Sequence, residues 1–60
     1  MNLDEFLARY NNDYDEINFK YKGTENWKTY YEMIREYDLQ ELTVYSFGID
    51  QFGDLYIEYK

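Results

Sequence analysis

The sequence predicts a small α+β domain in which two helices pack on a three-stranded sheet, in the order α, β, α, β, β. The main observation is a predicted C-terminal β-hairpin. Residues 42–49 and 55–59 are rich in β-branched and aromatic side chains, and the short polar segment 50–54 between them contains a glycine. Two such runs joined by so short a turn pair antiparallel. Upstream, two stretches repeat apolar residues at helical spacing and a third alternates as a strand does.

The N-terminal helix is predicted over residues 3–10. Asn2 stands at its N-cap position, and Glu5 follows three residues later, as in a capping box. The apolar residues of the helix recur on one face: Leu3, Phe6, Leu7 and Tyr10. Residues 11–15 favour a turn because Asn and Asp disfavour helix interiors.

The first strand is predicted over residues 16–22, which alternate between apolar and polar side chains. Ile17, Phe19 and Tyr21 fall on one face, and the intervening residues fall on the other. This pattern is typical of a strand with one face in the core and one face in water. Gly23 is expected to end the strand.

The longest helix is predicted over residues 25–37, with Thr24 as its N-cap. Its expected core face is an aromatic stripe: Trp27, Tyr30, Tyr31, Ile34 and Tyr37. Trp27 is therefore expected to be largely buried. The opposite side carries Glu25, Glu32 and Glu36, which are expected to form an exposed acidic ridge.

The first strand of the hairpin has apolar residues on both faces, so it needs cover on both sides. Leu42 and Val44 fall on one face, and Tyr45, Phe47 and Ile49 fall on the other. We expect a two-fold homodimer that covers exposed sheet, with the first helix covering that face within a monomer as the alternative. Three aromatic residues are expected to contribute to the dimer contact: Tyr45, Phe52 and Tyr56.

Sixty residues make one domain, residues 1–60, and a domain of this size buries only about 60% of its unfolded surface. The chain has no cysteine and no histidine, so neither a disulfide nor a Cys/His zinc site strengthens the fold. The chain lacks the residues that most often act as bases or thiolate nucleophiles, and it has little room for a substrate pocket. The sequence therefore predicts a protein that is not an enzyme.

No metal or cofactor site is predicted. Asn11, Asp13 and Asp15 occupy positions 1, 3 and 5 of a calcium loop, but Glu16 and Lys22 stand where that loop requires glycine and glutamate.

Thirteen acidic residues against six basic ones give a net charge of −7. Such a charge repels nucleic acids and anionic membranes and attracts basic surfaces.

The start of the chain is acidic where a signal peptide would be basic, and no apolar run approaches the roughly 20 residues that span a bilayer. We therefore expect a soluble, cytoplasmic protein without a membrane partner. The lean toward Asn, Tyr, Lys, Ile and Phe is typical of an AT-rich genome. Together with the short length, it suggests a phage or another mobile element.

Three functions are compatible with these features. The first is inhibition of a basic nucleic-acid-binding protein by a DNA-mimicking acidic surface. The second is a protein-binding adaptor or self-associating module whose charge serves only solubility. The third is an antitoxin or immunity protein that covers a basic active site. The predicted partner-binding carboxylates are Glu25, Glu32, Glu36, Asp38, Glu41, Asp50 and Asp54.

Overall fold

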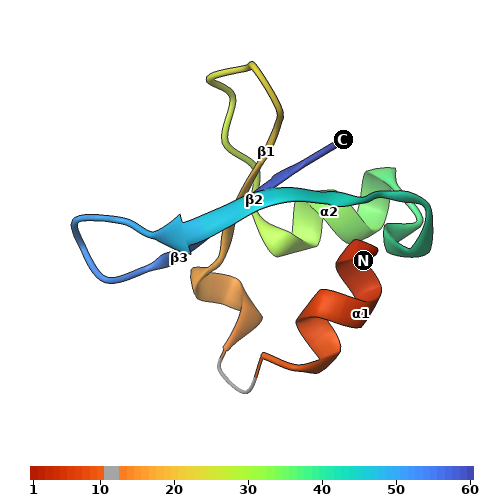
Figure 1. The fold of residues 1–60 in the computed structure, drawn as a ribbon, viewed down its shortest axis with the longest axis horizontal. Coiled ribbons are helices and arrows are strands. Elements are labelled where there is room, and N and C mark those ends of the chain that lie inside the picture. The colour runs from red at the N-terminus through yellow and green to blue at the C-terminus, as the bar shows by residue number, and fades with distance from the viewer. Residues whose placement is uncertain (11–12) are drawn as a thin grey trace.

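A computed structural model describes residues 1–10 and 13–60. It shows two α-helices, two short 3-10 helices and a mixed three-stranded sheet, so the predicted α+β class is confirmed (Figure 1). The elements are α1 (Leu3–Ala8), η1 (Tyr14–Glu16), β1 (Asn18–Tyr21), α2 (Tyr30–Glu36), η2 (Leu39–Glu41), β2 (Val44–Ile49) and β3 (Leu55–Tyr59). The predicted turn at residues 11–15 lies partly outside the described residues, because positions 11 and 12 are not among them.

The C-terminal hairpin forms as its composition predicts, and its second strand becomes the centre of the sheet. The strand order is β1-β3-β2. β3 pairs antiparallel with β2 and parallel with β1. The turn at residues 50–54 is closed by the Asp50 carboxylate, which accepts the backbone N–H groups of Phe52 and Asp54 at 2.8 and 3.0 Å. Gly53 adopts φ 88°, a conformation that glycine adopts without a steric cost.

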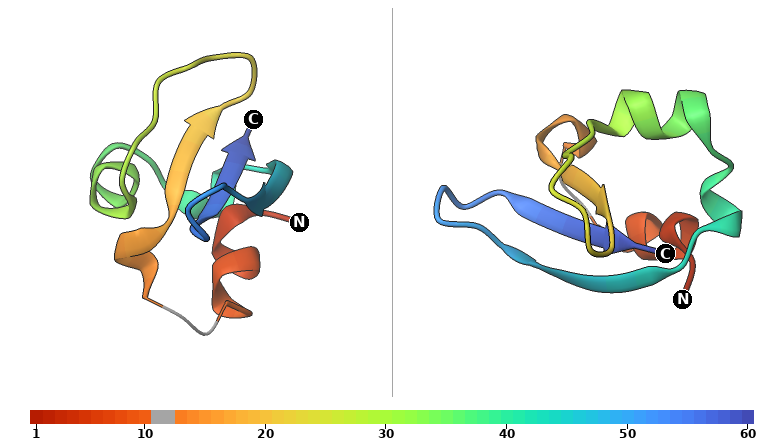
Figure 2. Two further views of the ribbon diagram at one scale, coloured as in Figure 1. Left: turned by 90° about the vertical axis from the view of Figure 1, so that its left-hand side faces the viewer. Right: turned by 90° about the horizontal axis from the view of Figure 1, so that it is seen from above.

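One face of the sheet is covered by the helices and holds the core (Figure 2). On β3, Leu55, Ile57 and Tyr59 are all buried, as the alternation of that strand predicts. The rest of the core comes from the other elements: Leu3, Leu7, Ile17, Phe19, Met33 and Leu39. Phe19 and Ile57 face each other across the parallel pair, so the two strands share this core.

The N-terminal helix begins as predicted, because the Asn2 side chain accepts the Glu5 N–H at 2.7 Å. Residues at the start of the chain, up to the first residue of α1, also join the sheet edge. Val44 N–H donates to the Met1 carbonyl at 3.0 Å, and Leu3 N–H donates to the Leu42 carbonyl at 2.9 Å. These bonds fasten the chain start along the outer side of the segment that leads into β2.

The predicted start of the long helix is wrong, and so is its predicted core face. α2 begins at Tyr30 because Thr29, rather than Thr24, is the N-cap. Residues before it are extended, and Lys28 exchanges backbone hydrogen bonds with Phe19 at 2.6 and 2.9 Å. Of the expected stripe only Tyr30 packs against the core, where it is half-buried, while Tyr31, Ile34 and Tyr37 are exposed. Met33 is the buried residue of the helix.

Trp27 is 48% exposed, so its expected burial is wrong. It lies in the extended segment before α2 and contacts the sheet face that is turned away from the core. There its ring meets the Tyr56 ring edge-on, with centroids 6.1 Å apart, and Lys20 Nζ lies 4.9 Å from the Trp27 ring centroid. Trp27 therefore shields part of the outer sheet face instead of filling the interior.

Candidate protein-binding site

The three carboxylates predicted to form a ridge do not share one helix face, so that arrangement is wrong. Glu25 lies in the loop before α2 and is exposed. Glu32 turns back to the helix start, where its Oε1 accepts the Thr29 backbone N–H at 3.0 Å while Thr29 Oγ1 accepts the Glu32 N–H at 3.2 Å. Glu36 Oε2 accepts a hydrogen bond from Lys28 Nζ at 2.6 Å. Two of the three carboxylates therefore stabilise the fold locally.

These local bonds set the proton affinities of the groups involved. Hydrogen bonds from the backbone and side chain of Thr29 hold the pKa of Glu32 below its ordinary value. The hydrogen bond to Glu36 raises the pKa of the Lys28 ammonium well above its usual range. Both groups are surface groups, so they remain charged near neutral pH.

The predicted carboxylates near the turns lie apart from one another. Asp38 caps η2 by accepting the Gln40 N–H at 3.0 Å, and Glu41 at the end of η2 is exposed. Asp50 and Asp54 belong to the hairpin turn and line a hollow of about 670 Å³ on the outer sheet face. The seven residues therefore occupy three regions: α2 and its preceding loop, η2, and the hairpin turn.

The most exposed apolar feature is the outer edge of β2. Beyond Val44, no other segment among residues 1–10 and 13–60 pairs with this edge. The exposed fractions of Phe47 and Ile49 are 58% and 63%, and that of Phe52 in the adjoining turn is 80%. The edge therefore combines unpaired backbone with exposed apolar side chains.

The hydrogen-bond pattern shows which backbone groups point outward. Asp50 N–H bonds Asp54 on β3's side of the hairpin, and hydrogen-bonded pairs alternate with non-bonded pairs in an antiparallel ladder. Gly48 and Ser46 therefore bond toward β3, whereas Phe47 and Ile49 direct their N–H and C=O groups away from the sheet. These outward groups are the positions at which another strand can bond.

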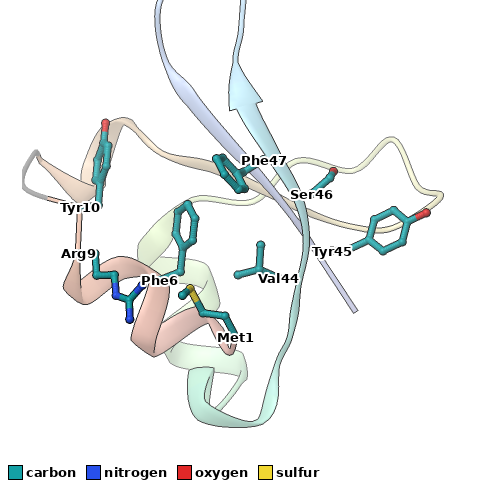
Figure 3. Close-up of a pocket in the computed structure, with 8 residues that line it drawn as sticks. All are labelled: Met1, Phe6, Arg9, Tyr10, Val44, Tyr45, Ser46 and Phe47. Atoms are coloured by element: carbon teal, nitrogen blue, oxygen red, sulfur yellow. The ribbon is translucent and has the colours of Figure 1, made fainter.

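A groove of about 660 Å³ runs beside this edge, between β2 and α1 (Figure 3). Phe6 and Phe47 point toward each other across it, with ring centroids 4.8 Å apart. Met1 and Val44 add apolar lining, and Arg9 adds a cation. The groove therefore offers an apolar surface next to outward-facing backbone groups.

Basic charge gathers near the start of β2. Within the described part of the chain, the salt bridges are Lys20–Glu58 at 3.9 Å and Lys28–Glu36 at 2.6 Å. Lys22 and Lys60 instead place their Nζ atoms 5.5 and 5.7 Å from the Tyr45 ring centroid. A β-bulge between Val44 and Ser46 makes Tyr45 the additional residue of the strand.

The sequence indicated the exposed apolar residues of β2 but not the groove beside them. Met1, Phe6 and Arg9 reach the groove only because the chain start bonds to residues 42–44, a contact across about forty residues. The sequence predicted apolar residues on both faces of residues 42–49, and this prediction is wrong. The β-bulge at Tyr45 brings Val44, Phe47 and Ile49 onto one face, the face that carries the buried residues of β3.

In the described residues, no group of three or more acidic side chains is arranged to hold a metal ion. The helices found there are all too short or too polar to cross a membrane. Comparison with protein-family models, curated proteins and solved structures gives no match for this chain.

Proposed function

We propose that this chain is a non-enzymatic protein-binding module that accepts a strand of another chain along the outer edge of β2. The observation that carries the proposal is the unprotected edge itself. Val44–Ile49 contains no charged residue and no proline, although charge and proline are common means by which edge strands avoid pairing. In strand addition, backbone bonds supply affinity and a neighbouring groove receives alternate side chains. The groove beside α1 lies where those side chains would enter.

The test compares two isoleucines that are both exposed. Ile49→Lys places a charge at the open edge, whereas Ile34→Lys makes the same change on α2, where the exposed fraction is 47%. Each variant is used as bait for proteins of the native cell, and the bound chains are identified by mass spectrometry. We expect Ile49→Lys to lose the bound chain and Ile34→Lys to retain it.

Hydrogen exchange supplies the structural readout. Binding by strand addition protects the outward amides of Phe47 and Ile49, because they become hydrogen-bonded to the added strand. A bound partner that leaves both amides unprotected, or that Ile49→Lys retains, contradicts the proposal.

The second candidate is inhibition of a basic nucleic-acid-binding protein, or cover of a basic active site, through the acidic surface. The net charge of −7 favours it, because the described ion pairs neutralise only Glu36 and Glu58 among thirteen acidic residues. Binding led by this surface weakens as salt rises. Competition by duplex DNA separates DNA mimicry from simple cover of a basic site.

Exposed carboxylates without structural bonds are the ones to test for the second candidate. Glu25→Lys with Glu41→Lys should weaken binding and reduce its salt dependence, whereas Ile49→Lys should have little effect. Indifference of the affinity to salt, DNA and the two reversals excludes this candidate.

We place the module in the cytoplasm, since a chain without cysteine has no disulfide to lose under reducing conditions.

A further inference from the structure

We infer that the strand received by β2 is β2 of a second copy, joined through a two-fold axis at Gly48. The inference rests on the proposed strand addition and names its partner. Two identical edges related by a two-fold axis run antiparallel, and each offers the same surface to the other. The edge must therefore complement itself in backbone bonding, space and charge.

Backbone bonding is complementary when the pairing is centred on Gly48. Phe47 then lies opposite Ile49 of the second copy, and Ile49 lies opposite Phe47 of the second copy. These are the residues whose N–H and C=O groups point outward, so each pair exchanges two hydrogen bonds. Each pair also sets an aromatic side chain beside a β-branched one, which is a favourable cross-strand combination.

The central residue of the pairing is a glycine, so no side chain of β2 itself stands at the axis. The two Gly48 residues meet as a non-hydrogen-bonded pair, in which the Cα atoms are only about 4.5 Å apart. Within its own chain, Gly48 is covered by Tyr56, whose Oη would lie 2.7 Å from a Cβ added at Gly48. In the Gly48-centred register, only residues from Phe52 onward reach the stretch of edge that residues 1–3 occupy. A register moved toward Val44 brings Asp50 and Gln51 of the second copy onto that stretch as well.

Charge is complementary because the two ends of β2 carry opposite signs. Lys22 and Lys60 flank Tyr45 at the start of the strand, and Asp50 and Asp54 lie in the turn after its end. In the antiparallel dimer, the acidic turn of each copy lies beside the basic end of the other. This proximity of opposite charges favours the pairing.

The groove also receives the turn of the second copy. The hairpin tip stands clear of both helices (Figures 1 and 2). In the Gly48-centred register, the segment from Ile49 to Phe52 of the second copy runs past residues 44–47, which form one wall of the groove. The exposed Phe52 thereby gains an apolar surface beside Met1 and Val44.

Light scattering measures the association directly. The wild-type chain should rise from 7.5 kDa toward twice that mass across micromolar concentrations. Ile49→Lys should remain at 7.5 kDa with an unchanged circular dichroism spectrum, while Ile34→Lys should associate as the wild type does. A wild-type mass that stays at 7.5 kDa overturns the inference, as does normal association of Ile49→Lys.

A charge exchange tests the ends of the strand. Lys22→Glu combined with Lys60→Glu sets acid against acid in its own dimer, and Asp54→Lys sets base against base. Each variant alone should associate at least tenfold more weakly than the wild type, by the order of effect expected for close charge pairs. An equimolar mixture should restore association, because both contacts then join opposite charges. Failure of the mixture to restore it contradicts the antiparallel arrangement.

Cross-linking tests the register, and no native cysteine competes for the introduced ones because the chain has none. Phe47→Cys and Ile49→Cys chains are mixed under oxidising conditions. Opposed residues fall within the Cα separation that a disulfide requires, so the mixed disulfide should exceed both homodimeric ones. Predominance of Phe47→Cys homodimers moves the axis away from Gly48 and overturns this register.

Failure of the inference is distinguishable from failure of the proposed function. A monomeric wild type that still loses a captured partner on Ile49→Lys overturns the dimer and leaves strand addition by another protein intact. If Ile49→Lys changes neither mass nor capture, both are overturned.

Discussion

At the scale of single residues, the structure reverses the expectation for two apolar side chains near α2. Trp27 covers the outer sheet face beside Tyr56, whereas Met33 is fully buried among core residues. We expect Trp27→Ala to lower the free energy of unfolding by about 1 kcal/mol, the order of one aromatic contact. Met33→Ala should cost about 2 to 5 kcal/mol because it leaves a cavity.

Urea unfolding of both variants checks the difference. The Met33→Leu variant is the control, since it keeps a similar volume in the core and should cost less than about 1.5 kcal/mol. If Trp27→Ala unfolded the chain, the result would contradict the exposed position of Trp27 and support the buried position that the helical spacing predicts.

The buried Tyr59 makes the stability of the fold depend on pH in the alkaline range. Burial and, next, a hydrogen bond with Tyr37 raise the pKa of Tyr59 from 10.0 to about 12. Between these values the unfolded chain loses this proton while the folded chain retains it. The stability contribution is therefore complete below pH 10 and disappears as the pH rises toward about 12.

We expect the free energy of unfolding to fall over that interval, and to fall less steeply in Tyr59→Phe. Urea titrations at successive pH values measure the slope. Tyr31→Phe is a useful comparison, because the pKa of Tyr31 is raised chiefly by a hydrogen bond with Asp15 rather than by burial. Identical slopes for Tyr59→Phe and the wild type would refute the assignment.

At the scale of elements, the start of α2 depends on a reciprocal capping box between Thr29 and Glu32. Thr29→Ala should destabilise the fold by about 1 kcal/mol. Glu32→Gln retains a side-chain acceptor and should be mild, whereas Glu32→Lys loses it and should lower the melting temperature. Thermal unfolding ranks the three variants, and equal effects of Gln and Lys would exclude the capping role.

The same contact predicts acid sensitivity. The pKa of Glu32 is lowered from 4.5 in the folded chain, so its contribution is present above pH 4.5 and is lost as the pH falls through the folded value. Glu32→Gln has no titrating carboxyl group at this position, so it should show a smaller loss of stability on acidification. Melting temperatures measured on both sides of pH 4.5 provide the comparison.

Local chemistry predicted the hairpin and α1, because the alternation of residues 55–59 and the Asn2 cap are complete within a few residues. The start of α2 was predictable too, since Thr29 is followed three residues later by glutamate and Thr24 is not. Strand order was not, because β1 and β3 are joined by parallel pairing across more than thirty residues. The groove depended on a similar distant contact.

At the scale of the whole molecule, acidic charge exceeds what the described ion pairs balance. Thirteen acidic residues face six basic ones, and two salt bridges form among residues 1–10 and 13–60. Salt screens the remaining repulsion, so the melting temperature should rise with sodium chloride. The rise should be smaller in a Glu25→Lys, Glu41→Lys variant, because these two reversals change the net charge from −7 to −3. Scanning calorimetry at matched protein concentration measures both slopes, and a fall of the wild-type value with salt contradicts the expectation.

The central place of β3 has a consequence for biosynthesis. β1 and β2 each pair with β3 and not with each other, yet β3 is the last of the three to be translated. A nascent chain halted before Leu55 therefore lacks β3, the central strand with which β1 and β2 both pair. Because the sheet closes only through contacts distant in sequence, folding should follow the emergence of this segment from the ribosome rather than proceed alongside synthesis.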